Sequence, residues 1–165
     1  MTPRDLARRL ALRPHPEGGW YRETYRGVQT VRLDRADGPV ERSVSTAILY
    51  LLEAGQVSAL HRIRSTEIWH HYAGGSLDVV QLLDGLAPVV TRLGSDLDAG
   101  EVPQAVVPSG VWFGARPGPG ADWALVGCTV APGFDFQDFE LGRRDDLLTR
   151  FPDCADWIER LSPAG

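Results

Sequence analysis

Alternating apolar and polar residues dominate the middle of the chain and predict β-strands, because successive side chains of a strand point to opposite faces. Turn signals separate these runs, and Asp84-Gly85 between two apolar runs predicts a two-residue hairpin. Short antiparallel strands at roughly even spacing are typical of a sandwich or barrel. The expected strands are 20–26, 44–52, 57–63, 67–72, 77–83, 87–93, 104–107, 111–115 and 123–130.

Helical patterns occur only at the two ends. Residues 2–13 predict a short helix, with Thr2 as its cap and Pro3 at its first position. Two further helices are expected at 144–150 and 153–161. No repeat or linker divides the chain, so we expect one all-β domain over residues 1–165, with its core at about 14–141.

Composition narrows the function classes. The 165 residues include no lysine, which excludes Schiff-base, pyridoxal-phosphate and Walker A lysine chemistry. Arginine in place of lysine throughout is typical of GC-rich coding DNA and suggests a bacterial source. A net charge of −5 without a basic run argues against a nucleic-acid partner.

Further sequence features bear on location. The apolar stretch 47–52 is too short to span a bilayer, so no membrane association is expected. The start of the chain is polar and arginine-rich, without the apolar segment of a signal peptide. Cys128 and Cys154 have no CxxC spacing. We therefore expect free thiols and a cytoplasmic location.

The segment 55–75 contains three of the four histidines: His61, His70 and His71. Strand alternation places His61 on one face of its strand, and Glu67 with His71 on one face of the next. If the turn keeps the pairing simple, His61 and Glu67 point into one barrel interior. A His–carboxylate pair of this kind is a candidate general base; a purely structural hydrogen-bonded pair is the alternative.

This segment resembles the first motif of cupins, G-x5-H-x-H-x3,4-E-x6-G. Gly55, His61, Glu67 and Gly74 keep its spacing, with Ile63 in place of the second histidine. Residues 108–113 resemble the core of the second motif, P-x-G-x2-H, with Phe113 at the histidine position. The resemblance extends to the uncharacterised cupin-5 subfamily through PHPEGGWYRETYR (14–26), STAILYLL (45–52), HRIRSTEIWHHYAGG (61–75), VPSGVWFGA (107–115) and LVGCTVAPGFDFQDFEL (125–141).

The resemblance implies a cupin double-stranded β-helix, the RmlC-like jelly roll. Metal-binding cupins hold their ion with three histidines and one glutamate, of which this chain keeps His61 and Glu67. We therefore expect no cofactor; if a divalent metal binds, the ligands would be His61, Glu67 and His71. A cupin fold hosts many activities, so the function must be argued from the site.

Further candidate site residues lie around the expected pocket. Tyr21 could return a proton, and Arg22 could hold an anionic group, although residues 20–26 could equally form a surface or dimer edge. Alternation places Tyr21, Glu23 and Tyr25 on the face opposite Arg22 and Arg26. The expected ligand-binding residues are Trp69, His71, Arg22, Trp112, Phe113 and Phe134, with His61, Glu67 and Tyr21 as the catalytic set.

Three functions follow from this set. The preferred one is a metal-independent isomerase or epimerase acting on a small molecule, by analogy with the jelly-roll deoxysugar-nucleotide epimerases that use a histidine base. The alternatives are a metal-dependent cupin oxygenase and a non-catalytic metabolite-binding module. A homodimer is expected, with the N-terminal strand covering a sheet edge.

Overall fold

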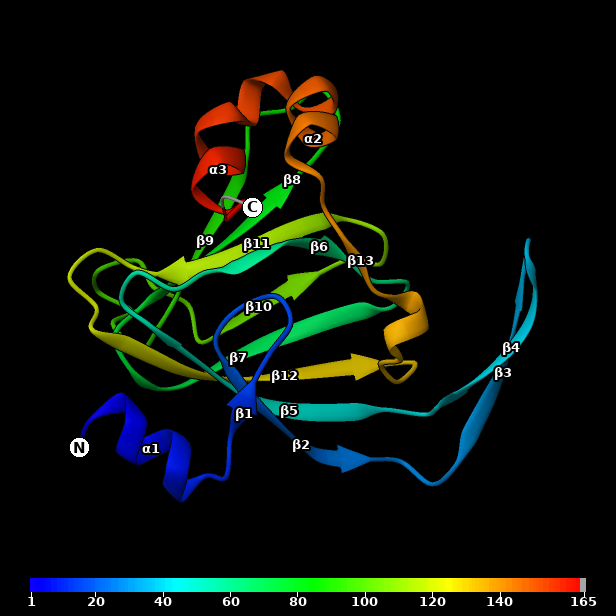
Figure 1. Cartoon of the computed structure of the whole chain (residues 1–165), viewed down its shortest axis with the longest axis horizontal. Helices are drawn as coiled ribbons and strands as arrows, with labels where there is room; N and C mark the ends of the chain where they lie inside the picture. Colours follow the sequence, from blue (N-terminus) through cyan, green and yellow to red (C-terminus); the bar gives the residue numbers. More distant parts are fainter. Residues whose placement is uncertain (164–165) are drawn as a thin grey trace.

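The computed structural model describes residues 1–163 and contains two antiparallel β-sheets that face each other (Figure 1). In spatial order, the larger sheet comprises β1 (Arg13–Pro14), β2 (Trp20–Arg26), β5 (Thr46–Glu53), β12 (Trp123–Ala131), β7 (Thr66–Gly74) and β10 (Gln104–Val107). The smaller sheet comprises β13 (Glu140–Leu141), β6 (Ser58–Arg62), β11 (Trp112–Pro117), β8 (Leu77–Leu82) and β9 (Val89–Leu93). This arrangement is the expected all-β jelly roll.

The main core lies between the two sheets. Inward-facing side chains from both sheets fill it, and the largest fully buried ones are Trp69, Tyr50 and Phe113. Tyr50 and Phe113 pack edge-on against the Trp69 indole, at centroid distances of 5.8 and 6.1 Å. Burial of these rings stabilises the barrel at one end and leaves the other end for a cavity.

The predicted strands match the observed ones to within a few residues. Trp20–Arg26 and Gln104–Val107 agree at both ends. β8 and β9 pair as an antiparallel hairpin, as predicted, but residues 83–88 join them instead of a two-residue turn. Within this connection the Leu86 N–H donates to the Leu83 carbonyl across Asp84-Gly85, and Gly85 has a positive φ of 71°. Apolar runs of strand length separated by turn residues therefore located the barrel strands, although β8 is buried along its whole length.

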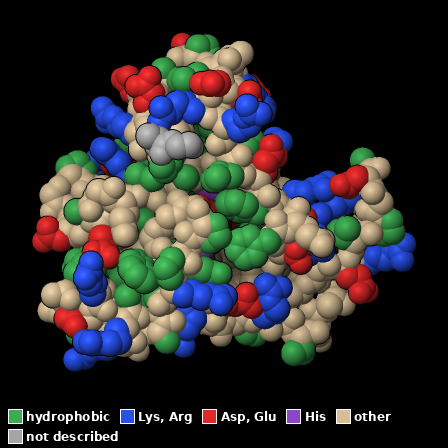
Figure 2. All heavy atoms as spheres, viewed as in Figure 1, with side chains coloured by type: hydrophobic (Ala, Val, Ile, Leu, Met, Phe, Trp, Pro, Cys, Tyr) green, Lys and Arg blue, Asp and Glu red, His purple; other side chains and the backbone are tan. Residues whose placement is uncertain are grey.

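A two-stranded hairpin was not predicted. β3 (Thr30–Arg35) and β4 (Gly38–Ser43) pair only with each other and project away from the barrel (Figures 1 and 2). Most of their side chains are exposed or half-buried, so the segment lacks the apolar run that identifies a core strand. Buried Asp138 joins the hairpin to the body by accepting hydrogen bonds from Arg35 and Arg42.

The terminal helices cover the outer faces of the sheets. α1 (Pro3–Arg9) packs through Ala7 on Leu51 and Leu125 of the larger sheet and is shorter than the predicted 2–13 helix. α2 (Arg144–Arg150), as predicted, and α3 (Ala155–Arg160) cover the smaller sheet, with 3-10 turn η2 (Pro152–Cys154) between them. Among the described residues, no helix is long and apolar enough to cross a membrane.

Candidate functional site

A cavity of about 300 Å³ opens between the sheets at the end opposite the Trp69 core. Four titratable side chains that line it are almost completely buried: Glu17, His61, Glu67 and Cys128. They come from the segment before β2, from β6, from β7 and from β12, so the barrel brings together groups that are far apart in the sequence. A buried cluster of this kind in a concave site is a candidate for acid–base chemistry.

Aromatic side chains form much of the cavity wall. Tyr21 lines it from β2, and three phenylalanines line it from the segment that contains η1 (Phe136–Asp138). His61 stacks on one of these rings, Phe139, at a centroid distance of 5.3 Å. The three phenylalanines are Phe134, Phe136 and Phe139, which contact one another edge-on. The wall is therefore suited to a carbon skeleton or a planar ring.

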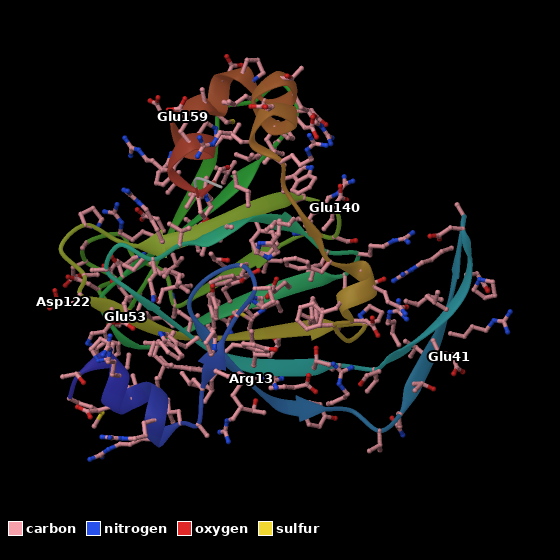
Figure 3. The ribbon with its side chains drawn as sticks, in the orientation of Figure 1. Arg13, Glu41, Glu53, Asp122, Glu140 and Glu159 are labelled. Atoms are coloured by element: carbon pink, nitrogen blue, oxygen red, sulfur yellow. The ribbon has the colours of Figure 1, made fainter. Side chains whose placement is uncertain are left out.

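Exposed charged residues surround the mouth. Glu23 and Arg26 line it as an ion pair, with Arg26 Nε 2.7 Å from Glu23 Oε1. Alternation had placed these two residues on opposite faces. The register of β2 shifts at Thr24, and this bulge brings Arg26 to the same side as Glu23. The Arg13 guanidinium of β1 lies over the Tyr21 ring, with its carbon 5.2 Å from the ring centroid. Figure 3 labels Arg13 next to β1, at the edge of the larger sheet.

A glycine turn positions Glu17. The His15 N–H donates to the carbonyl of Gly19 and the Gly18 N–H donates to the carbonyl of His15. Gly18 has a φ of 107°, and a Cβ there would lie 2.1 Å from the Val57 carbonyl oxygen, so the turn requires glycine. The Ala59 N–H of β6 donates to the Glu17 carbonyl and fixes this turn beside His61.

Glu17 and His61 form a direct pair inside the cavity. Glu17 Oε2 lies 3.0 Å from His61 Nε2, and the Ser58 hydroxyl donates to Glu17 Oε1 at 2.8 Å. His61 Nδ1 lies 2.7 Å from the Ala59 carbonyl oxygen, which only accepts hydrogen bonds. His61 Nδ1 therefore carries a proton, and in the neutral ring Nε2 accepts from a protonated Glu17.

Burial keeps this pair in its neutral form. It lowers the pKa of His61 to about 4, with the Ala59 hydrogen bond opposing the shift. It also raises the pKa of Glu17, against the smaller effects of His15, Ser58 and Tyr50. Burial disfavours both charged species, and the 3.0 Å contact places one shared proton between Glu17 Oε2 and His61 Nε2.

Glu67 is a second buried acid in the same cavity. Burial, followed by the charge of Glu17, raises the pKa of Glu67 to about 8, whereas Cys128 and Trp69 lower it. The Trp69 indole N–H is buried without a hydrogen-bond partner among residues 1–163. Its effect on the Glu67 carboxyl is to lower the pKa of that group. Glu67 is therefore mainly a neutral carboxylic acid at pH 7, close to the point where it can also act as a base.

The three residues expected to be catalytic all line this cavity: His61, Glu67 and Tyr21. Their arrangement differs from the expectation in one respect, because the carboxylate that contacts His61 is Glu17 and not Glu67. Of the residues expected to bind a ligand, Phe134 lines the cavity.

The other expected ligand-binding residues lie elsewhere. Trp69 and Phe113 belong to the barrel core, and Trp112 packs outside the barrel against the C-terminal helices. Arg22 is exposed. The His71 ring hydrogen-bonds through Nε2 to the Gly75 carbonyl at 3.0 Å. None of these five is part of the cavity lining.

His70 also lies outside the cavity. Its ring nitrogens contact Thr129 Oγ1 at 2.9 Å and Gln104 Nε2 at 3.1 Å, and it stacks on Tyr72. Neither of the two adjacent histidines therefore reaches His61 or Glu67.

The donor set does not fit a cupin metal centre. Ile63 and Phe113 occupy two of the histidine positions, and the Phe113 ring lies 4.2 Å from the His61 ring centroid to centroid. His71, the substitute considered as a third ligand, is absent from the cavity lining. Within the described chain, no group of three or more His, Cys, Asp or Glu side chains is arranged to hold a metal ion.

Sequence reasoning missed Glu17, His15, Cys128, Phe136 and Phe139 as lining residues. His15 and Glu17 precede the first predicted strand, in a segment rich in proline and glycine that indicates a loop. The sequence feature that could have indicated these two site residues is the His-x-Glu pair directly before Gly18-Gly19. The partner of Glu17 is 44 positions away, so only the folded chain shows the contact.

A wider groove of about 910 Å³ lies on the other side of the same turn. It shares His15 and Glu17 with the cavity, but its arginines, Arg143 and Arg144, are exposed. The buried acid–base groups favour the smaller cavity as the functional site.

Comparison with known proteins agrees with this architecture. The Cupin_5 model, described as Cupin superfamily (DUF985), matches residues 4–142, most of the chain. The chain belongs to the Cupin_5 family. Its fold is therefore that of the cupins.

Relatives from several organisms match most of the chain. The chain is 30% identical over 144 residues to the uncharacterized protein YML079W of Saccharomyces cerevisiae, covering 81% of this chain and 72% of the relative. It is similar to the structure of a hypothetical protein from Leishmania major (31% identity, TM-score 0.89), with 99% and 100% of the two chains covered. Protein SO0799 from Shewanella oneidensis is 36% identical with a TM-score of 0.85, over 98% and 97% of the chains.

Proposed function

We propose that this cupin binds a small molecule in the barrel cavity and moves a proton on it without a metal ion, as an isomerase or epimerase does. The observation that carries this proposal is the 3.0 Å contact between Glu17 Oε2 and His61 Nε2 in the same cavity as Glu67. The Glu17–His61 pair and Glu67 are two acid–base units in one buried site, so one can remove a proton from the substrate while the other supplies one.

The proposed step begins at a C–H bond next to a carbonyl. Glu17 takes the proton on one carboxyl oxygen as its own proton passes from Oε2 to His61 Nε2. The imidazolium that forms donates through Nδ1 to the Ala59 carbonyl. Glu67 protonates the carbonyl oxygen, so the substrate becomes a neutral enol and the charges remain on His61 and Glu67.

Tyr21 completes an epimerisation in this proposal. Its side chain lines the cavity from β2 and contacts the His15 ring at a centroid distance of 4.4 Å. A phenol can return a proton to the opposite face of the enol carbon while the enol O–H returns its proton to Glu67. The phenolate then takes a proton from water, and the His61 imidazolium releases one to water. Return by Glu17 to the original face would produce exchange without inversion.

Solvent deuterium exchange tests this function. The protein is incubated in D₂O with nucleotide-sugars and enolisable carbonyl compounds, and substrate mass and stereochemistry are followed. Glu17→Gln keeps a donor to His61 and an acceptor for Ser58 but cannot pass a proton, so exchange should fall by about 10²–10⁴-fold. Glu23→Gln at the mouth is the matched control and should exchange like the wild type.

Two results would count against the proposal. Exchange that survives Glu17→Gln would show that the pair is not the base. Binding of a compound without any exchange of its protons would favour the binding-module alternative.

We also propose that the protein is a homodimer in a bacterial cytoplasm. Exposed apolar side chains on the outer face of the larger sheet support a partner surface, among them Tyr72 (55% exposed) and Val106 (54%). The arginine-only basic composition and the free buried thiols Cys128 and Cys154 support the setting. Light scattering in solution tests the dimer, and a mass of 18.1 kDa, that of one chain, would contradict it.

A further inference from the structure

The mouth and the interior of the cavity differ in charge. At the mouth, arginine and acidic residues mix, and Arg26 is held by Glu23 and by the Phe134 carbonyl. Figure 2 likewise shows blue and red side chains interspersed on this face of the molecule. A charged group of either sign can therefore rest at the mouth, where water also solvates it.

The buried groups of the interior carry no permanent positive charge. The acidic ones are Glu17, Glu67 and Cys128, and the arginines that line the cavity, Arg13 and Arg26, are both exposed. Two imidazoles also line it, His61 and His15, the latter with a side chain that is 7% exposed, and burial lowers the pKa of both. An anion placed there would lose its hydration and meet carboxyl groups without a compensating charge.

Glu67 instead offers a hydrogen-bond donor. Every titratable group that influences it, Glu17 and Cys128, is buried with it, and burial holds its carboxyl in the protonated form. A protonated carboxyl has one O–H donor. A carbonyl oxygen is a suitable acceptor, because it brings no charge and no competing donor.

We propose that the interior of the cavity selects uncharged carbonyl compounds, whose oxygen accepts a hydrogen bond from Glu67 and whose carbon skeleton packs against Phe134 and Phe139. Carboxylates and phosphates are excluded from this position. The inference names the substrate class of the site and rests on the proton-transfer function proposed above.

Three probes with the same ring test it: acetophenone (neutral), benzoate (anion) and benzylammonium (cation). Their affinities for the full chain at pH 7 are compared by ligand-observed NMR titration. We expect acetophenone to bind at least tenfold more tightly than either ion. Arg26→Ala is the control for ions held at the mouth and should leave acetophenone binding unchanged.

Two variants of Glu67 distinguish donor from shape. Glu67→Gln keeps an N–H donor and should bind acetophenone within about threefold of the wild type. Glu67→Leu keeps similar size without a donor and should bind about tenfold more weakly, as expected for one lost hydrogen bond. Thermal unfolding confirms that each variant is folded before it is titrated.

Several outcomes would overturn the substrate class. Benzoate that binds as tightly as acetophenone or more tightly, also in Arg26→Ala, would do so, and so would benzylammonium that binds as tightly or more tightly. Acetophenone binding that is the same in a folded Glu67→Leu protein as in the wild type would also contradict it, as would failure of all three probes to bind. Other results separate the proposed function from the substrate class. Selective acetophenone binding without deuterium exchange of any compound would support the substrate class and contradict the proton-transfer function. Deuterium exchange on a carboxylate substrate would support the proton-transfer function and contradict the substrate class.

Discussion

At the scale of single residues, burial decides the chemistry of this cavity. Glu17 and Glu67 are carboxyl groups with almost no exposure to water, and His61 is an imidazole in the same position. Burial raises the pKa of both carboxyl groups, that of Glu67 to about 8, and lowers the pKa of His61 to about 4. The acid–base properties follow from the barrel interior as a whole and not from a sequence motif.

The raised pKa of Glu67 predicts a pH-dependent contribution to stability. The folded protein holds this proton up to a pH of about 8, whereas the unfolded chain releases it near its ordinary value of 4.5. The contribution is fully present below pH 4.5 and is lost as the pH rises through 8. Its slope between these values is about 1.4 kcal/mol per pH unit.

Glu67→Gln mimics the protonated acid and should remove this loss. Urea unfolding of the variant and of the wild type at pH 5 and pH 7.5 measures the difference. We expect the variant to gain stability over the wild type as the pH rises. A difference that is constant with pH would show that Glu67 titrates normally.

At the scale of elements, two connections set the geometry of the cavity. The turn over residues 15–19 carries Glu17 to His61, and the segment with η1 supplies the phenylalanine wall. Both lie outside the regular strands, so each depends on a few specific contacts. Changes at those contacts should disturb the site more than the barrel.

Gly18→Ala tests the turn. A Cβ at this position would lie 2.1 Å from the Val57 carbonyl oxygen, so the backbone must move and take Glu17 with it. Gly55→Ala is a matched control, since Gly55 also has a positive φ (83°) but open space around it. We expect a loss of about 1 kcal/mol for the control and clearly more for Gly18→Ala, with a changed His61 ¹⁵N shift only in the latter. Equal effects would refute the steric argument.

Asp138→Asn tests the anchor of η1. Asp138 is 8% exposed and contacts Arg35 at 2.7 Å and Arg42 at 2.9 Å; these two arginines hold its pKa well below the usual range despite the opposing effect of burial. Removing its charge leaves two arginines facing each other and should cost about 2–3 kcal/mol.

The exposed pair Asp37–Arg64 provides the control for this anchor. Asp37→Asn should leave stability nearly unchanged, because solvent screens this exposed pair. Hydrogen exchange of residues 134–139 should rise only in Asp138→Asn. Unchanged exchange there would show that the hairpin β3–β4 does not hold the phenylalanine wall.

At the scale of the whole molecule, the cupin barrel surrounds a donor set that does not fit a metal. Ile63 and Phe113 replace two ligands with carbon side chains. Elemental mass spectrometry of untagged protein, purified without chelator, should therefore give well below one metal ion per chain. A stoichiometric transition metal would contradict this and favour the oxygenase alternative.

The barrel could be predicted from the sequence because turn residues separate apolar runs of strand length, and because strands such as β7 and β10 alternate between a buried and a more exposed face. The same rule failed where the backbone departs from regularity. The bulge at Thr24 moves Arg26 to the cavity side, and the hairpin β3–β4 buries too little to show a pattern. The Glu17–His61 pair could not be predicted, because a glycine turn, and not strand periodicity, brings Glu17 to the barrel.

The central claim is that the cavity keeps a carboxyl group protonated at neutral pH, ready to donate to a substrate. The most direct test is a ¹³C NMR titration of the glutamate carboxyl groups, with Glu67→Gln to assign the signal. We predict that the Glu67 carboxyl titrates near pH 8. A midpoint near 4.5 would mean that Glu67 is ionised at neutral pH and would contradict the account.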